Sequence, residues 1–275
     1  AMNVRAVERQ SIEEGLRRAL DRQEFALHYQ PKIDLTTGVI TGAEALIRWT
    51  HPIRGAVSPA DFIPVAEDCG LILPIGKWVL REACMQARAW VKAGLPIGSM
   101  AVNISALEFR DEGFLDGVFA ILGETGLDPS FLELELTESV LMKRADFTAS
   151  VLQSLRAKGI RLAVDDFGTG YSSLSYLTRF PLDALKIDQS FVRQISLETE
   201  DTSIVAAVIS MGRSLKLRVI AEGVETQQEF AFLKAQHCDE AQGYYFSRPV
   251  SAKDFAVLLR TGIHERAISL SPLSG

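Results

Sequence analysis

The chain has 275 residues, 47% of them hydrophobic, and a formal net charge of −6 at pH 7. One α/β barrel of roughly 250 residues would use nearly all of this length, and the acidic balance argues against a surface that binds a DNA or RNA polymer. No stretch approaches the roughly 18 uninterrupted apolar residues of a membrane span, and the first residues lack the apolar segment of a signal peptide.

Short β-like apolar runs alternate with amphipathic helical stretches along the chain. The expected strands are residues 25–33, 39–49, 100–104, 131–137, 160–165, 184–187, 217–221 and 240–243. The expected helices include residues 59–67, 76–93, 144–158, 202–215, 226–235 and 252–259. Strands interleaved with helices in this way predict an α/β fold of the (β/α)8-barrel type, with an open doubly wound sheet as the alternative architecture.

The first two expected strands are joined by a very short loop. Residues 35–38, Leu-Thr-Thr-Gly, lie between them. A parallel pair would need a crossover of a dozen or more residues, whereas a short loop that contains Gly is typical of a hairpin. The first strand is therefore predicted to run antiparallel to the second.

Two adjacent carboxylates end the strand expected over residues 160–165. Asp165 and Asp166 follow a short apolar run and lead at once into a loop that contains Gly168 and Gly170. Adjacent carboxylates repel each other and are costly to dehydrate, so a cation is expected to compensate them. The glycines provide backbone that a ligand can approach closely. The segment therefore predicts a metal site beside a mobile loop.

Most of the later strands also end in a polar residue that an apolar strand does not need. The second strand carries Glu44, and the later strands end at or near Asn103, Glu135, Asp165 with Asp166, Lys186, Glu222 and Gln242. In a barrel the carboxyl ends of the strands converge on one face, where active sites of this fold lie. Strand alternation places Glu133 and Glu135 on the face opposite the leucines that separate them. Each such residue alone is more often a helix cap or surface group, and only their coincidence predicts a site.

The predicted cluster consists of oxygen ligands, which suit Mg²⁺ or Mn²⁺, whereas zinc favours His and Cys. Five or six such ligands exceed what one Mg²⁺ usually takes from a protein, so two ions are expected. Two metal ions are the usual arrangement for in-line displacement at phosphorus. Lys186 is the candidate for holding and polarising the nucleophile. A barrel lyase of the enolase type would use similar residues and is a further alternative.

Several short motifs follow one another in this chain. They are Tyr29-Gln30-Pro31, Ala43-Glu44-Ala45-Leu46-Ile47-Arg48-Trp49 with His51-Pro52, Asn103-Ile104-Ser105, Glu135-Leu136-Thr137-Glu138, Asp165-Asp166-Phe167-Gly168-Thr169-Gly170-Tyr171-Ser172-Ser173, Leu185-Lys186-Ile187-Asp188, Ala221-Glu222-Gly223-Val224-Glu225 and Ala241-Gln242-Gly243-Tyr244-Tyr245-Phe246. This ordered set resembles EAL domains, the cyclic di-GMP phosphodiesterases, over about residues 11–262.

The resemblance implies a modified TIM (β/α)8 barrel that hydrolyses cyclic di-GMP to linear 5′-pGpG with two Mg²⁺ or Mn²⁺ ions. It implies that one ion is bound by Glu44, Asn103, Glu135 and Asp165, and the second by Asp165, Asp166 and Glu222. The catalytic residues it implies are Lys186, Glu44, Glu222 and Asp165. The substrate-binding residues it implies are Gln30, Leu46, Arg48, Asp188, Glu225 and Gln242. Glu138 would anchor the loop from Asp166 to Ser173. The alternative is a catalytically inactive sensor module that binds cyclic di-GMP without turnover.

The resemblance also implies a homodimer formed near that loop. The opening segment from Val7 is expected to be a helix and resembles the connection that follows a GGDEF domain, so an upstream GGDEF or sensory domain is expected in a longer protein. Cys69, Cys84 and Cys238 form no close pair, so a cytoplasmic location is expected, with membrane anchoring through other segments left open. Residues 1–10 are expected to be cloning-derived residues and a linker, residues 11–262 the EAL domain, and residues 263–275 a disordered tail.

Overall fold

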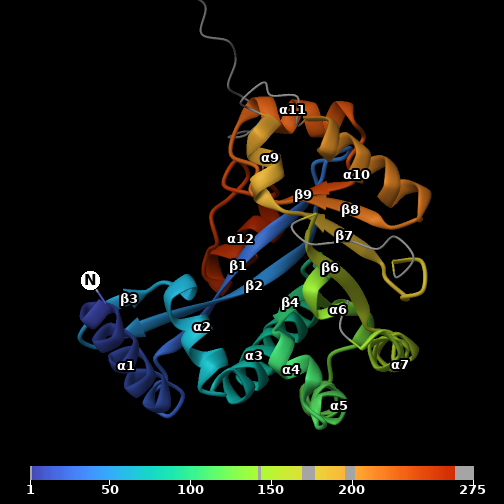
Figure 1. Cartoon of the computed structure of the whole chain (residues 1–275). Helices are drawn as coiled ribbons and strands as arrows, with labels where there is room; N and C mark the ends of the chain where they lie inside the picture. The colour runs from blue at the N-terminus through green and yellow to red at the C-terminus, as the bar shows by residue number, and fades with distance from the viewer. Residues whose placement is uncertain (1, 142–143, 169–176, 196–201, 264–275) are drawn as a thin grey trace, which may run out of the picture.

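The computed structural model describes residues 2–141, 144–168, 177–195 and 202–263, and its strands close into a barrel (Figure 1). The strands are β1 Phe25–Asp34, β2 Ile40–His51, β3 Gly55–Val57, β4 Met100–Ile104, β5 Leu132–Thr137, β6 Arg161–Phe167, β7 Ala184–Ile187, β8 Arg218–Ala221 and β9 Glu240–Ala241. Their order in the sheet is β1-β9-β8-β7-β6-β5-β4-β2-β3, and the additional pairing of β1 with β2 closes the barrel.

The first strand has the orientation that the short loop predicts. β1 runs antiparallel to β2 and also to β9, whereas the remaining neighbours around the barrel pair in parallel. The modified barrel is therefore confirmed, and the alternative of an open sheet is wrong. β3 was not expected, and it extends β2 as a short antiparallel hairpin outside the closed ring.

Helices cover the outer face of the barrel. They are α1 Met2–Ala19, α2 Pro59–Asp68, α3 Ile72–Lys92, α4 Ala106–Arg110, α5 Phe114–Thr125, α6 Glu138–Leu141, α7 Ala145–Ala157, α9 Gln189–Ile195, α10 Thr202–Ser214, α11 Gln227–Ala235 and α12 Ala252–Thr261. The helices expected from the sequence are present, and α4, α5, α6 and α9 add to them. Gly117 and Gly123 lower the helix propensity of α5, which packs against α3. Tertiary packing therefore stabilises α5, which the helix propensity of its own residues only weakly predicts.

The two faces of the barrel wall differ in chemistry. On β5, the leucines Leu132, Leu134 and Leu136 join the main apolar core beneath the helices. Glu133 and Glu135 point into the barrel instead and are still almost completely buried. A separate buried apolar group consists of Ala163, Ala184 and Ile220. Charged side chains thus occupy the barrel interior, where they require partners.

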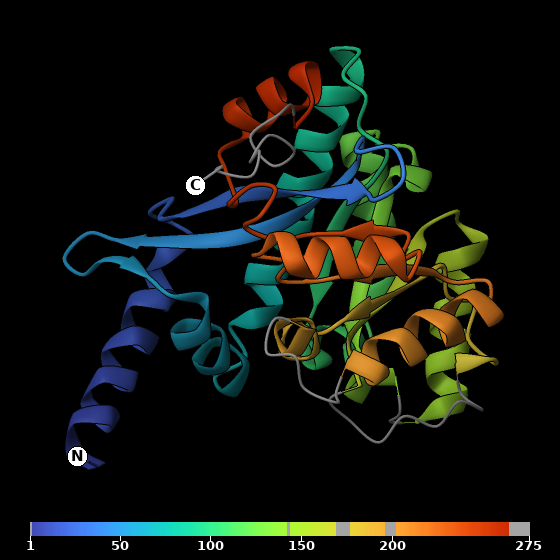
Figure 2. The ribbon, with the colours of Figure 1, turned by 90° about the horizontal axis from the view of Figure 1, so that it is seen from above.

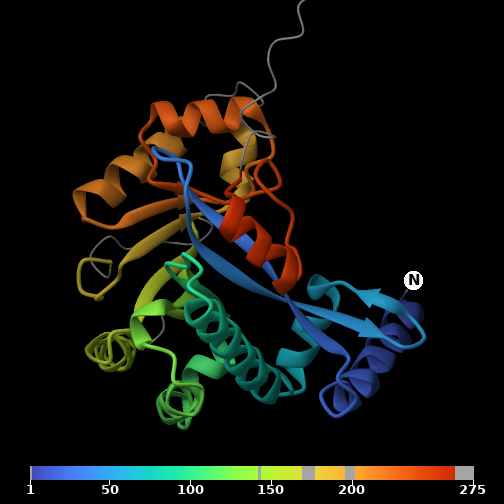
Figure 3. The ribbon, with the colours of Figure 1, turned by 180° about the vertical axis from the view of Figure 1, so that it is seen from behind.

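The helix α1 lies at one edge of the molecule, beside β3 and away from α10 and α11 (Figures 1 and 2). A second apolar core includes Leu16, Trp49 and Phe62. It packs α1 and α2 against the beginning of β1 and the end of β2. Elsewhere, α12 lies across β1 (Figure 3), and its Phe255 stacks on Trp90 of α3 with ring centroids 4.9 Å apart. The long β1–β2 ribbon is therefore packed against α1 and α2 at one end and against α12 elsewhere along β1.

The predicted division into residues 1–10, 11–262 and 263–275 stays a prediction. Residues 2–19 form one continuous helix across the first of these boundaries. From residue 264 on, the predicted tail lies outside the described residues. Within the described ranges, no helix combines the length and the apolar character needed to cross a membrane.

Candidate metal centre

The polar strand ends meet at one end of the barrel. They are Glu44 on β2, Asn103 on β4, Glu135 on β5, Asp165 and Asp166 on β6, Lys186 on β7, Glu222 after β8 and Gln242 after β9. Because these strands run parallel, their carboxyl ends open on the same face. The strand register places Asn103 directly beside Glu135. The structure therefore brings together all of the predicted metal ligands, while their roles stay predictions.

Lys186 lies at the centre of this group. Its side chain is fully buried, and its ammonium contacts the carboxylates of Glu135, of Glu222 at 2.5 Å, of Asp165 at 3.3 Å and of Glu44 at 3.7 Å. Burial alone would lower the pKa of Lys186, but the surrounding carboxylates raise this pKa well above its ordinary value. The side chain is therefore a permanent positive charge at neutral pH.

Asp165 and Asp166 both face the barrel mouth, although neighbouring residues of a strand normally point to opposite faces. Asp166 has a φ of 52°, in the left-handed region that few residues other than Gly adopt. The pairing of β6 with β7 is also irregular between Val164 and Phe167. This local distortion turns the second carboxylate toward the first.

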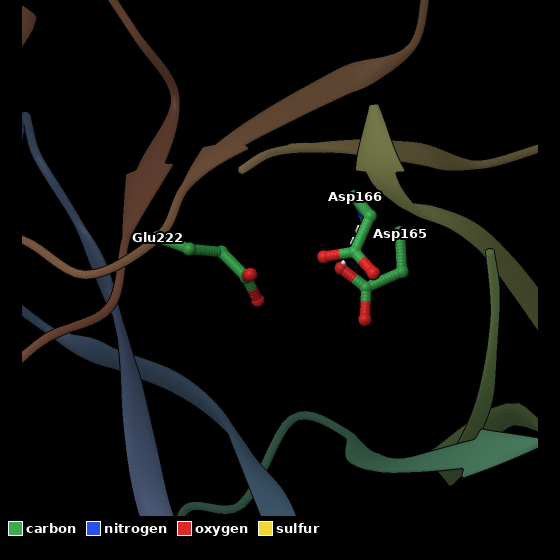
Figure 4. Close-up of side chains that lie close together, drawn as sticks. All are labelled: Asp165, Asp166 and Glu222. Atoms are coloured by element: carbon green, nitrogen blue, oxygen red, sulfur yellow. Dashed lines mark hydrogen bonds between the residues drawn. The ribbon is translucent and has the colours of Figure 1, made fainter. Parts of the chain in front are cut away.

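Glu222 completes an oxygen cluster with these two aspartates. Figure 4 shows Asp165 and Asp166 on one side of the mouth and the Glu222 carboxylate opposite them. One carboxylate oxygen from each residue lies within 4.8 Å of the other two. A divalent cation with oxygen ligands at 2.0–2.6 Å could bridge such a set after small side-chain movements.

A chain of hydrogen bonds orients Glu44. Its Oε1 accepts from the Asn103 amide at 2.6 Å, and its Oε2 accepts from Gln242 Nε2 at 2.6 Å. Gln242 Nε2 also donates to Gln30 Oε1 at 2.9 Å. Burial alone would raise the pKa of Glu44, but Lys186 and these hydrogen bonds bring it below its ordinary value. Glu44 is therefore an ionised carboxylate with a defined orientation.

Carboxylates outnumber the cation in this cluster. Burial, and then repulsion by neighbouring carboxylates, raise the pKa of Glu222 well above its ordinary value. Burial raises the pKa of Glu135 to about 8 against the attraction of Lys186, and burial with the adjacent Asp165 raises that of Asp166 to about 6. Among the described residues, Glu135 Oε1 has no hydrogen-bond partner. Oxygen ligands with an excess of negative charge fit hard divalent cations.

Lys32 on β1 is a second buried cation near the site, and the sequence motifs did not single it out. Its ammonium contacts Glu133 and lies 3.6 Å from Glu135 Oε1. Lys32 follows Gln30 by two residues, so strand alternation places both on the inner face. That alternation is the signal that could have identified it.

A cavity of about 240 Å³ lies beside the carboxylate cluster. Four of the predicted substrate-binding residues line it, namely Gln30, Leu46, Glu225 and Gln242. Gln189 and Arg193, which no sequence motif contains, also line the cavity, as does Tyr244, which lies in a motif but had no predicted role. Arg193 forms an exposed ion pair with Glu225 at 3.3 Å. The cavity thus combines amide, charged and aromatic groups next to the candidate metal ligands.

Two predicted substrate-binding residues lie outside the described lining of that cavity. Arg48 is partly buried and donates to the Ile47 carbonyl at 2.9 Å. Asp188 accepts from the backbone N–H of Ser190 at 2.9 Å at the start of α9. The capping contact gives Asp188 a structural role besides the predicted one, so its contact with substrate stays a prediction.

Glu138, the predicted loop anchor, is buried at the start of α6. Its Oε2 accepts from the backbone N–H of Gly168 at 3.3 Å, directly after the two aspartates. Of the loop from Asp166 to Ser173, residues 169–173 lie outside the described residues. The observed contact ties Glu138 to the beginning of that loop.

Comparison with known proteins gives a consistent result. The family model described as "EAL domain" matches residues 13–249. The bifunctional diguanylate cyclase/cyclic di-GMP phosphodiesterase MucR of Pseudomonas aeruginosa is 45% identical over 253 residues, which are 92% of this chain and 37% of that protein. The cyclic di-GMP phosphodiesterase NbdA of the same organism is 44% identical over 271 residues, 98% of this chain and 35% of that protein. The chain therefore spans little more than a third of these relatives.

A solved structure described as the PaMucR phosphodiesterase in complex with c-di-GMP has the same fold. It superposes with a TM-score of 0.87 at 44% sequence identity, covering 89% of this chain and 99% of that one.

Proposed function

Because the chain belongs to the EAL domain family, we propose that it hydrolyses cyclic di-GMP to linear 5′-pGpG in a reaction that depends on Mg²⁺ or Mn²⁺. The observation that carries this proposal is the excess of oxygen ligands around Lys186 at the barrel mouth. The relatives named as cyclic di-GMP phosphodiesterases and the solved complex with c-di-GMP support the choice of substrate.

Two ions are proposed, with Asp165 shared between them. The first would be held by Glu44, Asn103, Glu135 and Asp165, and the second by Asp165, Asp166 and Glu222. When bound, such ions stabilise the charge on the attacking and leaving oxygens of a phosphodiester. These residues fit divalent cations for two reasons. They offer only oxygen atoms as ligands, and their carboxylates outnumber the single ammonium of Lys186.

Lys186 is proposed to orient the attacking water. Its ammonium has three donors and lies between Glu135 and Glu222. A water that accepts a hydrogen bond from Lys186 would turn its lone pair toward phosphorus and its protons toward the neighbouring carboxylates. Glu222, whose side chain is partly exposed, would accept one of those protons. Glu44 and Asp165 complete the proposed catalytic set.

The cavity beside the cluster is proposed to hold the nucleotide. Gln30, Leu46, Glu225 and Gln242 would contact it there. Arg48 would pair with a substrate phosphate, which its fixed positive charge suits. Asp188 would contribute from the start of α9.

The decisive experiment incubates the purified chain with cyclic di-GMP and Mg²⁺ or Mn²⁺, and separates the products by chromatography. We expect pGpG only when metal is present, and none after chelation. Glu44→Gln serves as the inactive variant, and Lys253→Met, at an exposed position of α12, as the matched control. Unchanged substrate with tight binding would identify a sensor module. If cyclic di-GMP does not bind at all, a barrel lyase of the enolase type becomes the favoured alternative.

Three further inferences rest on the family resemblance and on the cysteine pattern rather than on contacts in this chain. We infer a homodimer, a cytoplasmic location, and an upstream GGDEF or sensory domain in a longer protein. MucR is named as bifunctional, with a cyclase activity besides the phosphodiesterase, which supports the last of these. Sedimentation at several protein concentrations tests the dimer, and a fully active strict monomer would contradict it.

A further inference from the structure

A second cluster of buried charges lies inside the barrel below the candidate metal centre. We call it the lower cluster, and it consists of Lys32, Glu133, Arg218 and Glu240. Glu133, Arg218 and Glu240 stand near the amino ends of β5, β8 and β9, opposite the barrel mouth. Because β1 is antiparallel, Lys32 near its carboxyl end reaches the same level. Arg218 donates to Glu133 at 2.6 Å and to Glu240 at 2.8 Å.

Lys32 connects the lower cluster to the metal centre. Its ammonium contacts Glu133 on one side and lies 3.6 Å from Glu135 Oε1 on the other. The other oxygen of Glu135, Oε2, bonds to Lys186. Glu135 therefore lies between two buried ammonium groups, one on the side of the mouth and one below it. The side chains of Lys32 and Glu135 have no exposed surface, so bulk water does not compete with this contact.

Lys32 and Arg218 both pair with Glu133, and Arg218 is also shared with Glu240. Arg218 pairs with the Glu133 carboxylate through a short hydrogen bond. A fully buried lysine is costly to dehydrate, and apolar residues of the same volume often stabilise a core as well or better. Compensation of Glu133 accounts for one contact of Lys32 and leaves its contact with Glu135 unexplained. Its second contact, with a candidate metal ligand, offers a reason for a charge at this position.

We propose that Lys32 is a positioning residue that holds the Glu135 carboxylate in the orientation required to bind a metal ion. The inference rests on the proposed function, since it concerns the same metal centre. Lys32 attracts Glu135 Oε1 from below across 3.6 Å, while Lys186 bonds to Oε2 on the side of the barrel mouth. Without Lys32, the contact between Lys186 and Oε2 alone would orient this carboxylate. Groups that orient a metal ligand typically contribute about 10–100-fold to metal affinity.

Two double variants separate this role from general stability. Lys32→Met/Glu133→Gln removes one cation and one anion from the lower cluster together with the contact to Glu135. Arg218→Met/Glu133→Gln removes the same number of charges but keeps Lys32 beside Glu135. Mn²⁺ affinity is measured by titration with detection of free Mn²⁺ by electron paramagnetic resonance, and folding by thermal unfolding in chelator.

The two variants are expected to differ in metal affinity. We expect Lys32→Met/Glu133→Gln to bind Mn²⁺ about tenfold or more weakly than wild type, and Arg218→Met/Glu133→Gln to stay within about threefold of it. Equal or tighter binding in the variant without Lys32 would overturn the proposal. If that variant does not fold, Lys32→Arg, which keeps the charge but moves its donors, replaces it, and unchanged affinity would again overturn the proposal. Wild-type protein that fails to bind Mn²⁺ would instead refute the proposed function itself.

Discussion

Replacing Lys186 by Met is expected to destabilise the metal-free protein and to enlarge its stabilisation by Mn²⁺. The Lys186 side chain is fully buried, and its ammonium lies 2.5 Å from Glu222 and 3.3 Å from Asp165. Met has a similar length and no charge, so the substitution removes the charge and preserves most of the packing. The carboxylates around it would then face one another without a counter-ion.

The expected loss follows from the cost of breaking a buried ion pair. Removing one partner of such a pair typically costs about 3–5 kcal/mol. For a chain of this size, each kcal/mol lowers the melting temperature by roughly 2 °C, so a decrease of about 6–10 °C is expected. The loss should grow as the pH rises above 8, because burial raises the pKa of Glu135 to about 8 even beside Lys186, and without Lys186 this carboxyl group keeps its proton to still higher pH. At lower pH a proton on Glu135 replaces part of the missing charge.

A bound divalent cation should restore much of this stability. Ligand that binds only the folded state at a hundred times its dissociation constant stabilises by about 2.7 kcal/mol. The variant should gain more than wild type, because the metal then supplies the only compensating charge. The assay is thermal unfolding at pH 8.5 in chelator and in Mn²⁺, with Lys253→Met as the exposed control. Equal melting temperatures of Lys186→Met and wild type in chelator would refute this electrostatic reasoning.

Three further predictions concern other residues. Glu44→Gln should lower turnover by more than about a hundredfold, because loss of a ligand exceeds the effect of losing a supporting group; the melting temperature should change little, and near-normal product formation would contradict its role. Glu138→Ala should weaken Mn²⁺ binding about tenfold, since the backbone of Gly168 loses its acceptor; wild-type affinity in a metal titration would disprove the anchor. Glu108→Gln should alter the pH dependence of stability, because burial raises the pKa of Glu108 from 4.5 to about 7 in the folded state. Since the unfolded chain loses this proton first, wild type should become less stable between about pH 4.5 and 7, by up to about 3 kcal/mol. The Gln variant, which can keep the capping contact with Ser105, should lack this loss, and parallel urea-unfolding profiles at pH 4 and pH 8 would show the reasoning to be wrong.

Much of the barrel could be predicted from local sequence patterns. Alternation with a period of two marks which side of a strand each residue occupies, so the inward positions of Glu133 and Glu135 follow from their neighbours alone. The short loop at residues 35–38 decides the antiparallel orientation of β1 without reference to the rest of the chain. The polar residues at the ends of successive strands could also be predicted to lie together, because the carboxyl ends of parallel strands in a barrel share one face.

Local patterns were less informative where packing overrides propensity. α5 contains two interior glycines and forms against α3, so its sequence alone is a weak helix signal. β3 is too short for a periodic pattern and exists because β2 extends beyond the closed ring. Both elements depend on contacts with another element, α3 for α5 and β2 for β3.

The sequence by itself determined which polar residues stand at the strand ends, and the tertiary structure decided how they meet. No pattern of alternation predicts that Asp166 turns its carboxylate beside that of Asp165, because this requires a left-handed backbone at φ 52°. Nor does the sequence show that Lys32 reaches Glu135, which lies more than a hundred residues away. Residue identity and strand period are local properties, whereas such contacts depend on the register and closure of the whole barrel.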